Sequence, residues 1–329
     1  MLNILEALPE NFFEIKSTEL YKTFSGPTLI RLKGKTDKPL LLSSLMHGNE
    51  FSSLIALQEV LAAYKNKTLP RNLDIFFGNP LAAAKSLRHL PEQPDFNRIW
   101  EEGDLPENKM AQAVLKIYKN SPPFLSIDMH NNSGKNPCYS VVSILNSENL
   151  NLANLFTPLV MYNAIVRATN TQAFSSLCPS ITVEASTPGD PIGIENLISL
   201  INKALELTEL PKTDPKALNL NIVNTIGTIF VPSKTTIDIK GKNADIVLEP
   251  NFENHNFKIA PKGTEIGSYT DPHRLIEKGP LGNELNPGFL EYKNGKIFLN
   301  KPMIPGMYTT NPHLMKTNCV CYILDKIDL

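Results

Sequence analysis

Two histidines and two glutamates stand at the ends of apolar runs in this sequence, where their side chains could act together. The first pair lies in HGNE (47–50), between an apolar run that ends at Met46 and an amphipathic stretch that begins at Phe51. His47 and Glu50 can aim at one point across a strand-to-helix turn, and Gly48 would let the backbone bend between them. An HxxE spacing also occurs in ordinary polar loops, so the motif needs support from elsewhere in the chain.

A second histidine occupies the same kind of position. The run FLSIDMHNN places His130 at the end of another apolar strand, and Asp128 projects from the same strand face two residues earlier. Two histidines, one glutamate and a position open to water form the catalytic zinc site of several hydrolases. Asp128 could then accept the remaining ring N–H of His130. The alternative is that His130 caps a loop and that Asp128 is simply paired.

The second glutamate could supply the proton acceptor that metal-assisted hydrolysis needs. Glu184 ends the β-branched run SITVEA (180–185). A charged residue in such a run is disfavoured unless it is paired or functional. The alternative is an ordinary surface residue at a strand end.

Three further polar residues lie between the two histidine motifs. Arg88, Asn97 and Arg98 follow Asn79-Pro80 in a segment that prolines interrupt too often for one helix. The planar guanidinium of arginine matches a carboxylate, and an adjacent asparagine adds a neutral donor. These residues suit an anionic small-molecule substrate, although isolated arginines are usually solvated.

The apolar runs that must position these residues alternate with amphipathic stretches. We expect strands at 39–46, 73–77, 124–129, 139–145 and 180–185, and helices at 51–64, 110–119, 152–164 and 194–207. Strands that alternate with helices predict an α/β fold, with a mostly parallel twisted sheet covered by helices on both faces. The carboxyl ends of such strands form one edge, where sites of open α/β sheets lie.

The composition of the sequence changes near residue 208, where the segment TELPKTDPKAL contains two prolines and several charged residues. Short β-like pieces follow at 221–232 and 296–304, with Gly-Pro, Asn-Pro and Asn-Gly pairs among them. We therefore expect a catalytic domain over 1–210 and a smaller β-rich domain over 211–329.

Composition narrows the class of partner. The 32 Lys+Arg and 33 Asp+Glu give a net charge of -1 without a basic stripe, so a nucleic-acid partner is not expected. No apolar window approaches the length of a membrane span, and the first residues lack a signal-peptide pattern, which favours the cytoplasm. The four cysteines form no CxxC pair and are expected to be reduced thiols. Neither GxSxG nor a glycine-rich nucleotide motif is present, which disfavours a serine hydrolase and a nucleotide enzyme.

As an ordered set, the motifs resemble the succinylglutamate desuccinylase/aspartoacylase family, a branch of the zinc carboxypeptidase-like fold. The resemblance rests on HGNE (47–50), GNPLAA (78–83), Arg88 with DFNR (95–98), DMH (128–130) and TVE (182–184). It spans roughly residues 40–190.

The resemblance implies a role for each matching residue. His47, Glu50 and His130 would bind one zinc ion per chain, and Glu184 would be the general base. Arg88 resembles the arginine that steadies the developing oxyanion, and Asn97 and Arg98 resemble the pair that binds the substrate carboxylate. Tyr308 lies where family members present a substrate-contacting tyrosine in their β-rich domain.

The expected function is therefore zinc-dependent hydrolysis of the amide bond of an N-acyl (succinyl- or acetyl-type) acidic amino acid, in a protein that could form a homo-oligomer. Two alternatives remain open from the sequence. One is a metallocarboxypeptidase that acts on peptides. The other is a zinc-stabilised binding protein without catalysis.

Overall fold

The structure is a computed structural model that describes residues 2–163, 165–240 and 243–329. The chain divides into two compact units. Unit 1 comprises residues 1–131, 138–221 and 329, and unit 2 comprises residues 132–137 and 222–328. The division at 210 expected from the sequence falls between the last long helix of unit 1 and the first strand of unit 2. Each unit is described separately below.

Unit 1 is built on a sheet in the order β1-β2-β4-β3-β5-β8-β6-β7. These strands are β1 (Asn3–Leu5), β2 (Thr28–Leu32), β3 (Leu40–Ser44), β4 (Leu73–Phe77), β5 (Leu125–His130), β6 (Tyr139–Val142), β7 (Leu159–Tyr162) and β8 (Ser180–Glu184). Neighbouring strands run parallel except at β2–β4 and β6–β8, so the expectation of a mostly parallel sheet is confirmed. Strands β3 and β4 are buried along their whole length, which explains why LLLSS and LDIFF lack a polar face.

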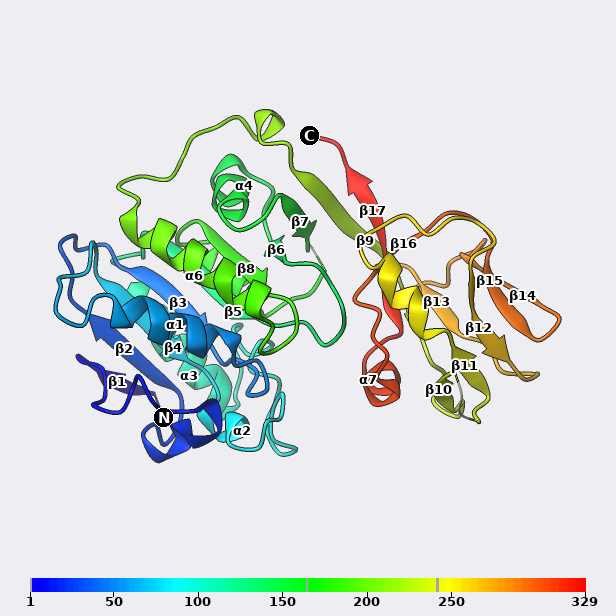
Figure 1. The fold of residues 1–329 in the computed structure, drawn as a ribbon, viewed down its shortest axis with the longest axis horizontal. Coiled ribbons are helices and arrows are strands. Elements are labelled where there is room, and N and C mark those ends of the chain that lie inside the picture. Colours follow the sequence, from blue (N-terminus) through cyan, green and yellow to red (C-terminus); the bar gives the residue numbers. More distant parts are fainter. Residues whose placement is uncertain (1, 164, 241–242) are drawn as a thin grey trace. The chain divides into compact units, whose positions relative to one another are not determined.

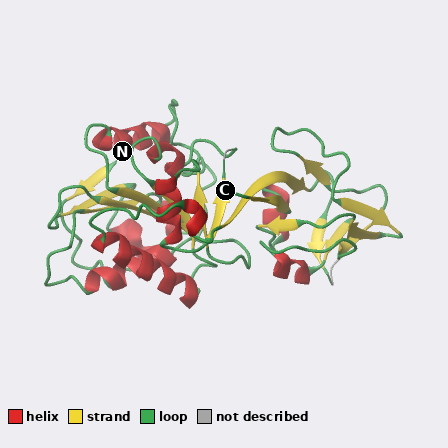
Figure 2. Ribbon diagram, turned by 90° about the horizontal axis from the view of Figure 1, so that it is seen from above, coloured by secondary structure: helices red, strands yellow, loops and turns green. Residues whose placement is uncertain are grey.

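Helices cover both faces of this sheet. They are α1 (Ser52–Ala62), α2 (Pro80–Ala83), α3 (Pro106–Tyr118), α4 (Ser147–Asn154), α5 (Asn170–Phe174) and α6 (Pro191–Glu206), with short 3-10 turns at Ser17–Lys22 and Pro215–Ala217. Helices α1 and α6 pack against each other in front of the strands, and α3 lies behind them (Figure 1). The edge-on view in Figure 2 shows helices above and below the strands of this unit.

Local sequence signals set where two of these helices begin. Asp190 caps α6 by accepting the backbone N–H of Ile192, and Pro191 occupies the first turn, where its missing N–H costs nothing. Asn79 and Pro80 start α2 in the same way, with the Asn79 side chain accepting from the Ala82 N–H. The short α2 thereby lies directly after β4, at the edge of the sheet that carries the candidate site.

One expected helix is wrong. The stretch 152–164 is not one helix, because α4 ends at Asn154 and β7 occupies Leu159–Tyr162. Pro158 lies between the two elements and cannot continue a helix, since it lacks the N–H donor and its ring crowds the preceding turn. The apolar residues after it instead form a strand beside β6.

Unit 2 is rich in β-structure, as expected. A sheet in the order β10-β11-β12-β15-β14 contains five strands, namely β10 (Ile237–Ile239), β11 (Ile246–Leu248), β12 (Glu265–Tyr269), β15 (Lys296–Leu299) and β14 (Leu290–Lys293). Beside it, β9 (Asn221–Phe230) pairs with β13 (Ile276–Lys278) and β17 (Cys321–Ile327), and β17 pairs with β16 (Ile304–Gly306). A 3-10 turn at Pro250–His255 and helix α7 (Pro312–Thr317) complete the unit.

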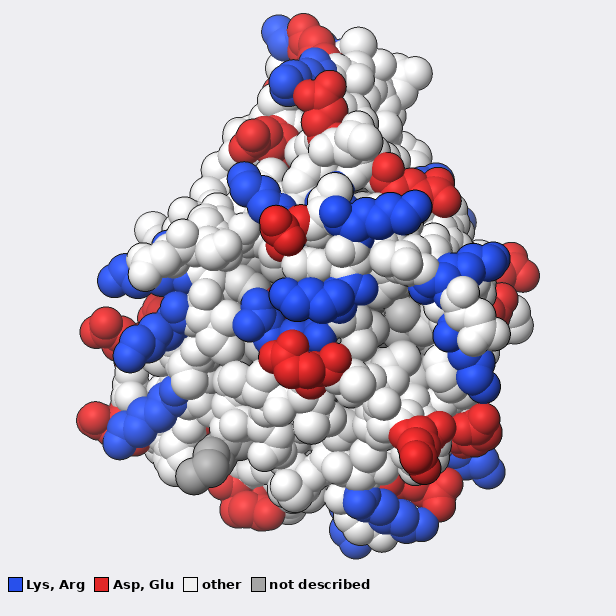
Figure 3. Space-filling view, turned by 90° about the vertical axis from the view of Figure 1, so that its left-hand side faces the viewer, with Lys and Arg blue, Asp and Glu red and all other residues white. Residues whose placement is uncertain are grey.

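Two observations concern the protein surface. Within the described part of the chain, no helix combines the length and apolar character that crossing a membrane would require. On the face drawn in Figure 3, lysine and arginine side chains are interspersed with aspartate and glutamate. This mixed face agrees with the near-zero net charge of the sequence.

Candidate metal centre and active site

The turn between β3 and α1 brings His47 and Glu50 together. Leu45 adopts a left-handed φ of 51° where the strand ends, and the Glu50 N–H donates to the His47 carbonyl at 3.1 Å. A Cβ atom at position 48 would stand 2.1 Å from the backbone nitrogen of Ala83. Glycine is therefore required at Gly48 by the close approach of α2, and not by the backbone bend expected from the sequence.

His130 and Glu184 lie at the ends of two neighbouring parallel strands. His130 is the last residue of β5 and Glu184 the last of β8, and the two are register partners. Adjacent parallel strands place register partners on the same face of the sheet. The Ala185 N–H donates to the His130 carbonyl at 2.9 Å, which continues the pairing one residue beyond β8.

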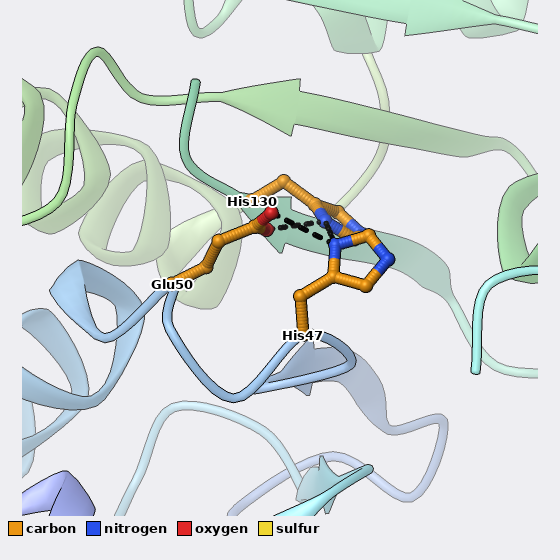
Figure 4. Close-up of side chains that lie close together, drawn as sticks. All are labelled: His47, Glu50 and His130. Carbon is orange, nitrogen blue, oxygen red and sulfur yellow. Dashed lines mark hydrogen bonds and ion pairs between the residues drawn. The ribbon is translucent and has the colours of Figure 1, made fainter. Parts of the chain in front are cut away.

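His47, Glu50 and His130 meet at one buried point (Figure 4). Glu50 Oε1 lies 2.8 Å from His47 Nδ1, and Glu50 Oε2 lies 2.7 Å from His130 Nδ1. The two Nδ1 atoms are 3.1 Å apart. One ligand atom from each residue lies within 4.8 Å of the other two, so the three form a group that could hold a metal ion.

The outward-facing nitrogen of each histidine meets a carboxylate. His130 Nε2 lies 2.9 Å from Asp128 Oδ2. His47 Nε2 lies 3.0 Å from Asp95 Oδ1. If both Nε2 atoms carry the ring proton, both Nδ1 lone pairs face the common point, which is the arrangement of histidine ligands held by outer carboxylates.

Sequence reasoning did not assign a role to Asp95. Besides His47, this carboxylate accepts two hydrogen bonds from Arg88, from Nε at 3.1 Å and from Nη2 at 2.8 Å. Its position in the DFNR segment, close to Asn97 and Arg98, was the one sequence feature that could have indicated a role for Asp95. Arg88 lies in the same segment as Asp95, whereas His47 is 48 residues away along the chain, and only the fold brings it to this carboxylate.

The charges at this point perturb one another strongly. Burial by itself would raise the pKa of Glu50, but the positive forms of His47 and His130 outweigh it and hold that pKa well below its usual range. Burial would lower the pKa of His130, whereas the attraction of Asp128 and Glu50 raises it well above its usual value. The site therefore favours positive charge at its centre.

The donor set fits a divalent ion. Four carboxylates, those of Glu50, Asp95, Asp128 and Glu184, act on this site against the guanidiniums of Arg88 and Arg98. Two imidazole nitrogens and a carboxylate oxygen are the ligand types that zinc takes in catalytic sites.

Glu184 lies beside this group without belonging to it. Its Oε2 atom is buried and has no hydrogen-bond partner among the described residues. Burial raises the pKa of Glu184 to about 8; the negative charges of Glu50 and Asp128 add to this effect, and His130 and Arg88 oppose it. A carboxyl group in this state is suited to exchanging a proton near neutral pH.

Arg88, Asn97 and Arg98 also lie in unit 1, close to the group formed by His47, Glu50 and His130. Arg88 Nη1 is 3.7 Å from Glu50 Oε1. Asn97 is 7 % exposed, and its Nδ2 lies 3.2 Å from His130 Nε2 while its Oδ1 accepts from the Asn170 N–H at 2.9 Å. The exposed Arg98 donates from Nη1 to the Asn97 carbonyl at 2.6 Å.

Tyr308 is a core residue of unit 2. Its side chain is 1 % exposed, packs edge-on against Phe252 with ring centroids 5.1 Å apart, and donates from its hydroxyl to the Glu249 carbonyl at 2.9 Å. These contacts account for the residue as part of the packing of unit 2. The substrate-contacting tyrosine expected from the resemblance finds no support in them.

Comparison with solved structures identifies the fold. A succinylglutamate desuccinylase from Chromobacterium violaceum is 16% identical with a TM-score of 0.57, and the match covers 90% of this chain and 86% of that one. A succinylglutamate desuccinylase/aspartoacylase from Rhodobacter sphaeroides is 12% identical with a TM-score of 0.62, over 90% and 88% of the two chains. Murine aminoacylase 3 is 15% identical with a TM-score of 0.56, over 89% and 96%.

No protein-family model and no curated protein sequence matches the chain. At these levels of identity, the structural likeness defines the fold and leaves the activity to be argued from the site. The fold expected from the motif resemblance is confirmed.

Proposed function

We propose that this protein is a zinc-dependent amidohydrolase that removes the acyl group from an N-acyl amino acid. The observation that carries the proposal is the convergence of His47 and Glu50, from the turn after β3, and His130, from the end of β5, on one buried point. The proposal includes membership of the succinylglutamate desuccinylase/aspartoacylase family, which the ordered motifs and the shared fold support.

The reaction needs a nucleophile, a proton carrier and stabilisation of developing charge. Zinc, when bound, would act as a Lewis acid and lower the pKa of a coordinated water to about 7. Glu184 would take the proton of the attacking water and pass it to the nitrogen of the departing amine. Its unpartnered Oε2 and its raised pKa, about 8, support this role.

Arg88 would face the oxygen that becomes negative as the amide carbonyl is attacked. Asp95 holds its guanidinium through two hydrogen bonds, which fixes the orientation of the side chain before substrate arrives. Preorganised donors of this kind typically contribute about 3–4 kcal/mol to the stability of the transition state.

Arg98 is the residue we assign to the substrate carboxylate. Its side chain is exposed, and Asn97, which precedes it, accepts the Asn170 backbone N–H through Oδ1. An arginine on such an anchored segment can present two parallel N–H groups to a carboxylate.

The test is a hydrolysis screen of the zinc-loaded protein with N-acetyl, N-formyl, N-propionyl and N-succinyl amino acids, alongside short peptides. We expect release of free amino acid from at least one N-acyl amino acid, loss of turnover after chelation and recovery on adding zinc. Cleavage of C-terminal residues from peptides alone would replace the proposal with a metallocarboxypeptidase. Stoichiometric zinc binding without cleavage of any substrate would replace it with a binding protein.

A further inference from the structure

Asn131 lies where three segments of unit 1 that carry candidate catalytic residues meet. It directly follows His130 at the end of β5 and is 4% exposed. Its backbone N–H donates to Glu50 Oε2 at 3.2 Å, and its side-chain Oδ1 accepts the N–H of Ser52, the first residue of α1, at 3.2 Å. Its Nδ2 donates to the Ala185 carbonyl at 2.9 Å. Asn131 therefore bonds both to the turn after β3 and to the turn after β8.

The partners of the Asn131 side-chain amide fix its orientation. A backbone N–H needs an acceptor and a carbonyl needs a donor, so the amide oxygen must face the Ser52 N–H. The amide nitrogen must face the carbonyls of Ala185 and Ser186, at 2.9 and 3.2 Å. A flipped amide would place donor against donor and acceptor against acceptor. The side chain thus has one donor end and one acceptor end, which substitutions can remove separately.

The donor end holds the chain directly after Glu184. The Ala185 N–H donates to the His130 carbonyl at 2.9 Å, and the Ala185 carbonyl accepts from Asn131. Ser186 then adopts a left-handed φ of 56°, which is unfavourable for a residue with a side chain. Both backbone polar groups of Ala185 are therefore bonded to the end of β5, and the Asn131 amide also bonds the strained residue that follows.

The acceptor end holds the start of α1. The N–H of Ser52 is one of the N-terminal helix groups that have no partner within the helix, and Asn131 Oδ1 supplies the acceptor. The Ser52 hydroxyl in turn accepts the Gly189 N–H at 2.9 Å, which adds a second link to the turn after β8. Asn131 thus joins the turn that carries Glu50 to the turn that begins after Glu184.

The position of the Glu184 carboxylate depends on this backbone support. Its Oε2 atom is buried and has no hydrogen-bond partner among the described residues, so no described hydrogen bond holds that oxygen toward the candidate metal ligands. The backbone at the end of β8 then sets where the carboxylate lies relative to His47, Glu50 and His130. A displacement of about 1 Å at a catalytic group can lower a rate by about 100-fold.

Resting on the proposed deacylase function, we infer that Asn131 is a positioning residue for the general base: its side-chain amide holds Glu184 in place relative to the candidate metal ligands. Asn131 acts through the backbone of Ala185 and Ser186 and supplies no atom to the reaction. The role requires the Nδ2 donor, which bonds the two carbonyls.

Two substitutions of Asn131 test this role. Asn131→Asp keeps the shape and an acceptor for the Ser52 N–H, but it replaces the donor with an oxygen that faces two carbonyls. Asn131→Ala removes both ends without adding charge, and Asn131→Ser takes its place if that variant does not fold. With an N-acyl amino acid and zinc-loaded protein, we expect kcat to fall about 10–100-fold in both the charged and the neutral variant, with KM changed less than about threefold and zinc stoichiometry kept.

A double-mutant cycle with Glu184→Gln shows whether Asn131 acts through Glu184. In the Glu184→Gln background, removal of the Asn131 amide should lower the residual kcat by less than about threefold, because the group that it positions no longer accepts a proton. Losses that multiply in the double variant would show that Asn131 acts on another step and would overturn the inference.

Asn149 offers a matched control at the other end of the same strand. It is 1% exposed, its Oδ1 accepts the N–H of Ser180, the first residue of β8, at 3.0 Å, and its Nδ2 donates to the Ile144 carbonyl at 3.1 Å. Asn149→Ala therefore removes a buried amide that supports β8 away from Glu184. We expect it to lower thermal stability and to leave kcat within about twofold of the wild type.

A second readout does not depend on turnover. Amide hydrogen exchange over residues 185–190, measured on zinc-free protein by mass spectrometry, reports how firmly the turn after β8 is held. We expect exchange there to be at least about tenfold faster in Asn131→Ala and unchanged in Asn149→Ala.

The outcomes separate the inference from the proposed function. Wild-type kcat in the Asn131 variants, a loss confined to the charged Asn131→Asp, or unchanged exchange over 185–190 would each overturn the inference and leave the deacylase function standing. If wild-type protein that holds zinc cleaves no N-acyl amino acid, the deacylase function is wrong and the inference falls with it.

Discussion

His47 Nδ1 and His130 Nδ1 lie 3.1 Å apart, although 83 residues separate them in sequence. Each nitrogen also lies within 2.8 Å of an oxygen of Glu50, while the opposite nitrogen of each ring meets its own carboxylate. The two imidazole rings therefore face each other across the Glu50 carboxylate, and Asp95 and Asp128 orient them from the opposite side. This arrangement is expected of a metal site whose ligands are held in position before the ion binds.

Removal of a ligand should abolish metal binding. His47→Ala and His130→Ala are expected to weaken zinc binding by more than about 100-fold, because each removes a ligand and not only its outer partner. Zinc content after dialysis, measured by mass spectrometry, checks this. His313→Ala, which alters an exposed histidine of unit 2, is the matched control and should keep the zinc of the wild type. A full zinc complement in both site variants would disprove the assignment of the ligands.

The carboxylates of Asp95 and Asp128, which lie behind the two histidines, should also affect the affinity for zinc. Asp95→Asn and Asp128→Asn remove the acceptors that orient His47 and His130, so we expect zinc affinity to fall about 10–100-fold in each. Asp95→Asn should also lower kcat/KM in zinc-saturated protein, since Asp95 holds Arg88 as well. Competition with a chromogenic chelator measures the affinities, and Asp37→Asn serves as an exposed control. Affinities equal to that of the control would exclude the orienting role.

Glu184→Gln should separate catalysis from metal binding. The substitution keeps the size of the side chain but removes the proton acceptor, so kcat is expected to fall about 10²–10⁴-fold with zinc content unchanged. Steady-state kinetics and metal analysis on the same preparation provide the two measurements. The exposed Glu195→Gln on α6 is the control. Near wild-type turnover in Glu184→Gln would remove Glu184 from the mechanism.

Asp74 provides a prediction about stability and pH, away from the site. This residue of β4 is 2 % exposed and accepts hydrogen bonds from the Tyr118 hydroxyl at 2.7 Å and from Arg31 Nε at 3.3 Å. Burial raises the pKa of Asp74 above its ordinary value of 3.8, and its two partners offset only part of the effect. The folded state thus retains a proton that the unfolded chain releases, so stability from this group is present below about pH 3.8 and is lost as the pH rises through the folded pKa.

Asp74→Asn cannot titrate, and its stability relative to the wild type should therefore rise between about pH 4 and pH 7. Each unit by which folding raises the pKa corresponds to about 1.4 kcal/mol. Urea unfolding at several pH values measures the difference. Tyr118→Phe, which removes a donor to the carboxylate, should steepen the loss of wild-type stability with pH. A difference between Asp74→Asn and the wild type that is constant with pH would contradict the raised pKa.

Much of the fold could be predicted because buried strands and helices have characteristic patterns of apolar residues in the sequence. The strands expected at 73–77 and 180–185 correspond to β4 and β8, since a strand covered on both faces needs an unbroken apolar or β-branched run. The error at 152–164 arose because an apolar stretch fits a buried helix and a buried strand equally well by periodicity. Pro158 was the signal that could have divided it.

The chemical residues of the candidate site were likewise visible in the sequence, because histidines and glutamates at the ends of apolar strands are unusual and their order along the chain matches a known pattern. Their partners were harder to predict. Asp95 contacts His47 and Arg88 through a loop whose path no local pattern specifies, and the buried position of Tyr308 depends on the packing of all of unit 2.

The sequence by itself determined strands β3, β4, β5, β6 and β8, helices α1, α3 and α6, and the types of side chain available at the strand ends, since local propensity and hydrophobic patterning act over a few residues. Only the tertiary structure decided that His47, Glu50 and His130 share one point, that Asp95 and Asp128 lie behind the two histidines, and that Glu184 Oε2 is buried without a hydrogen-bond partner among the described residues. The physical reason is that distances and dielectric environment depend on strand order and register, which join residues far apart in the chain.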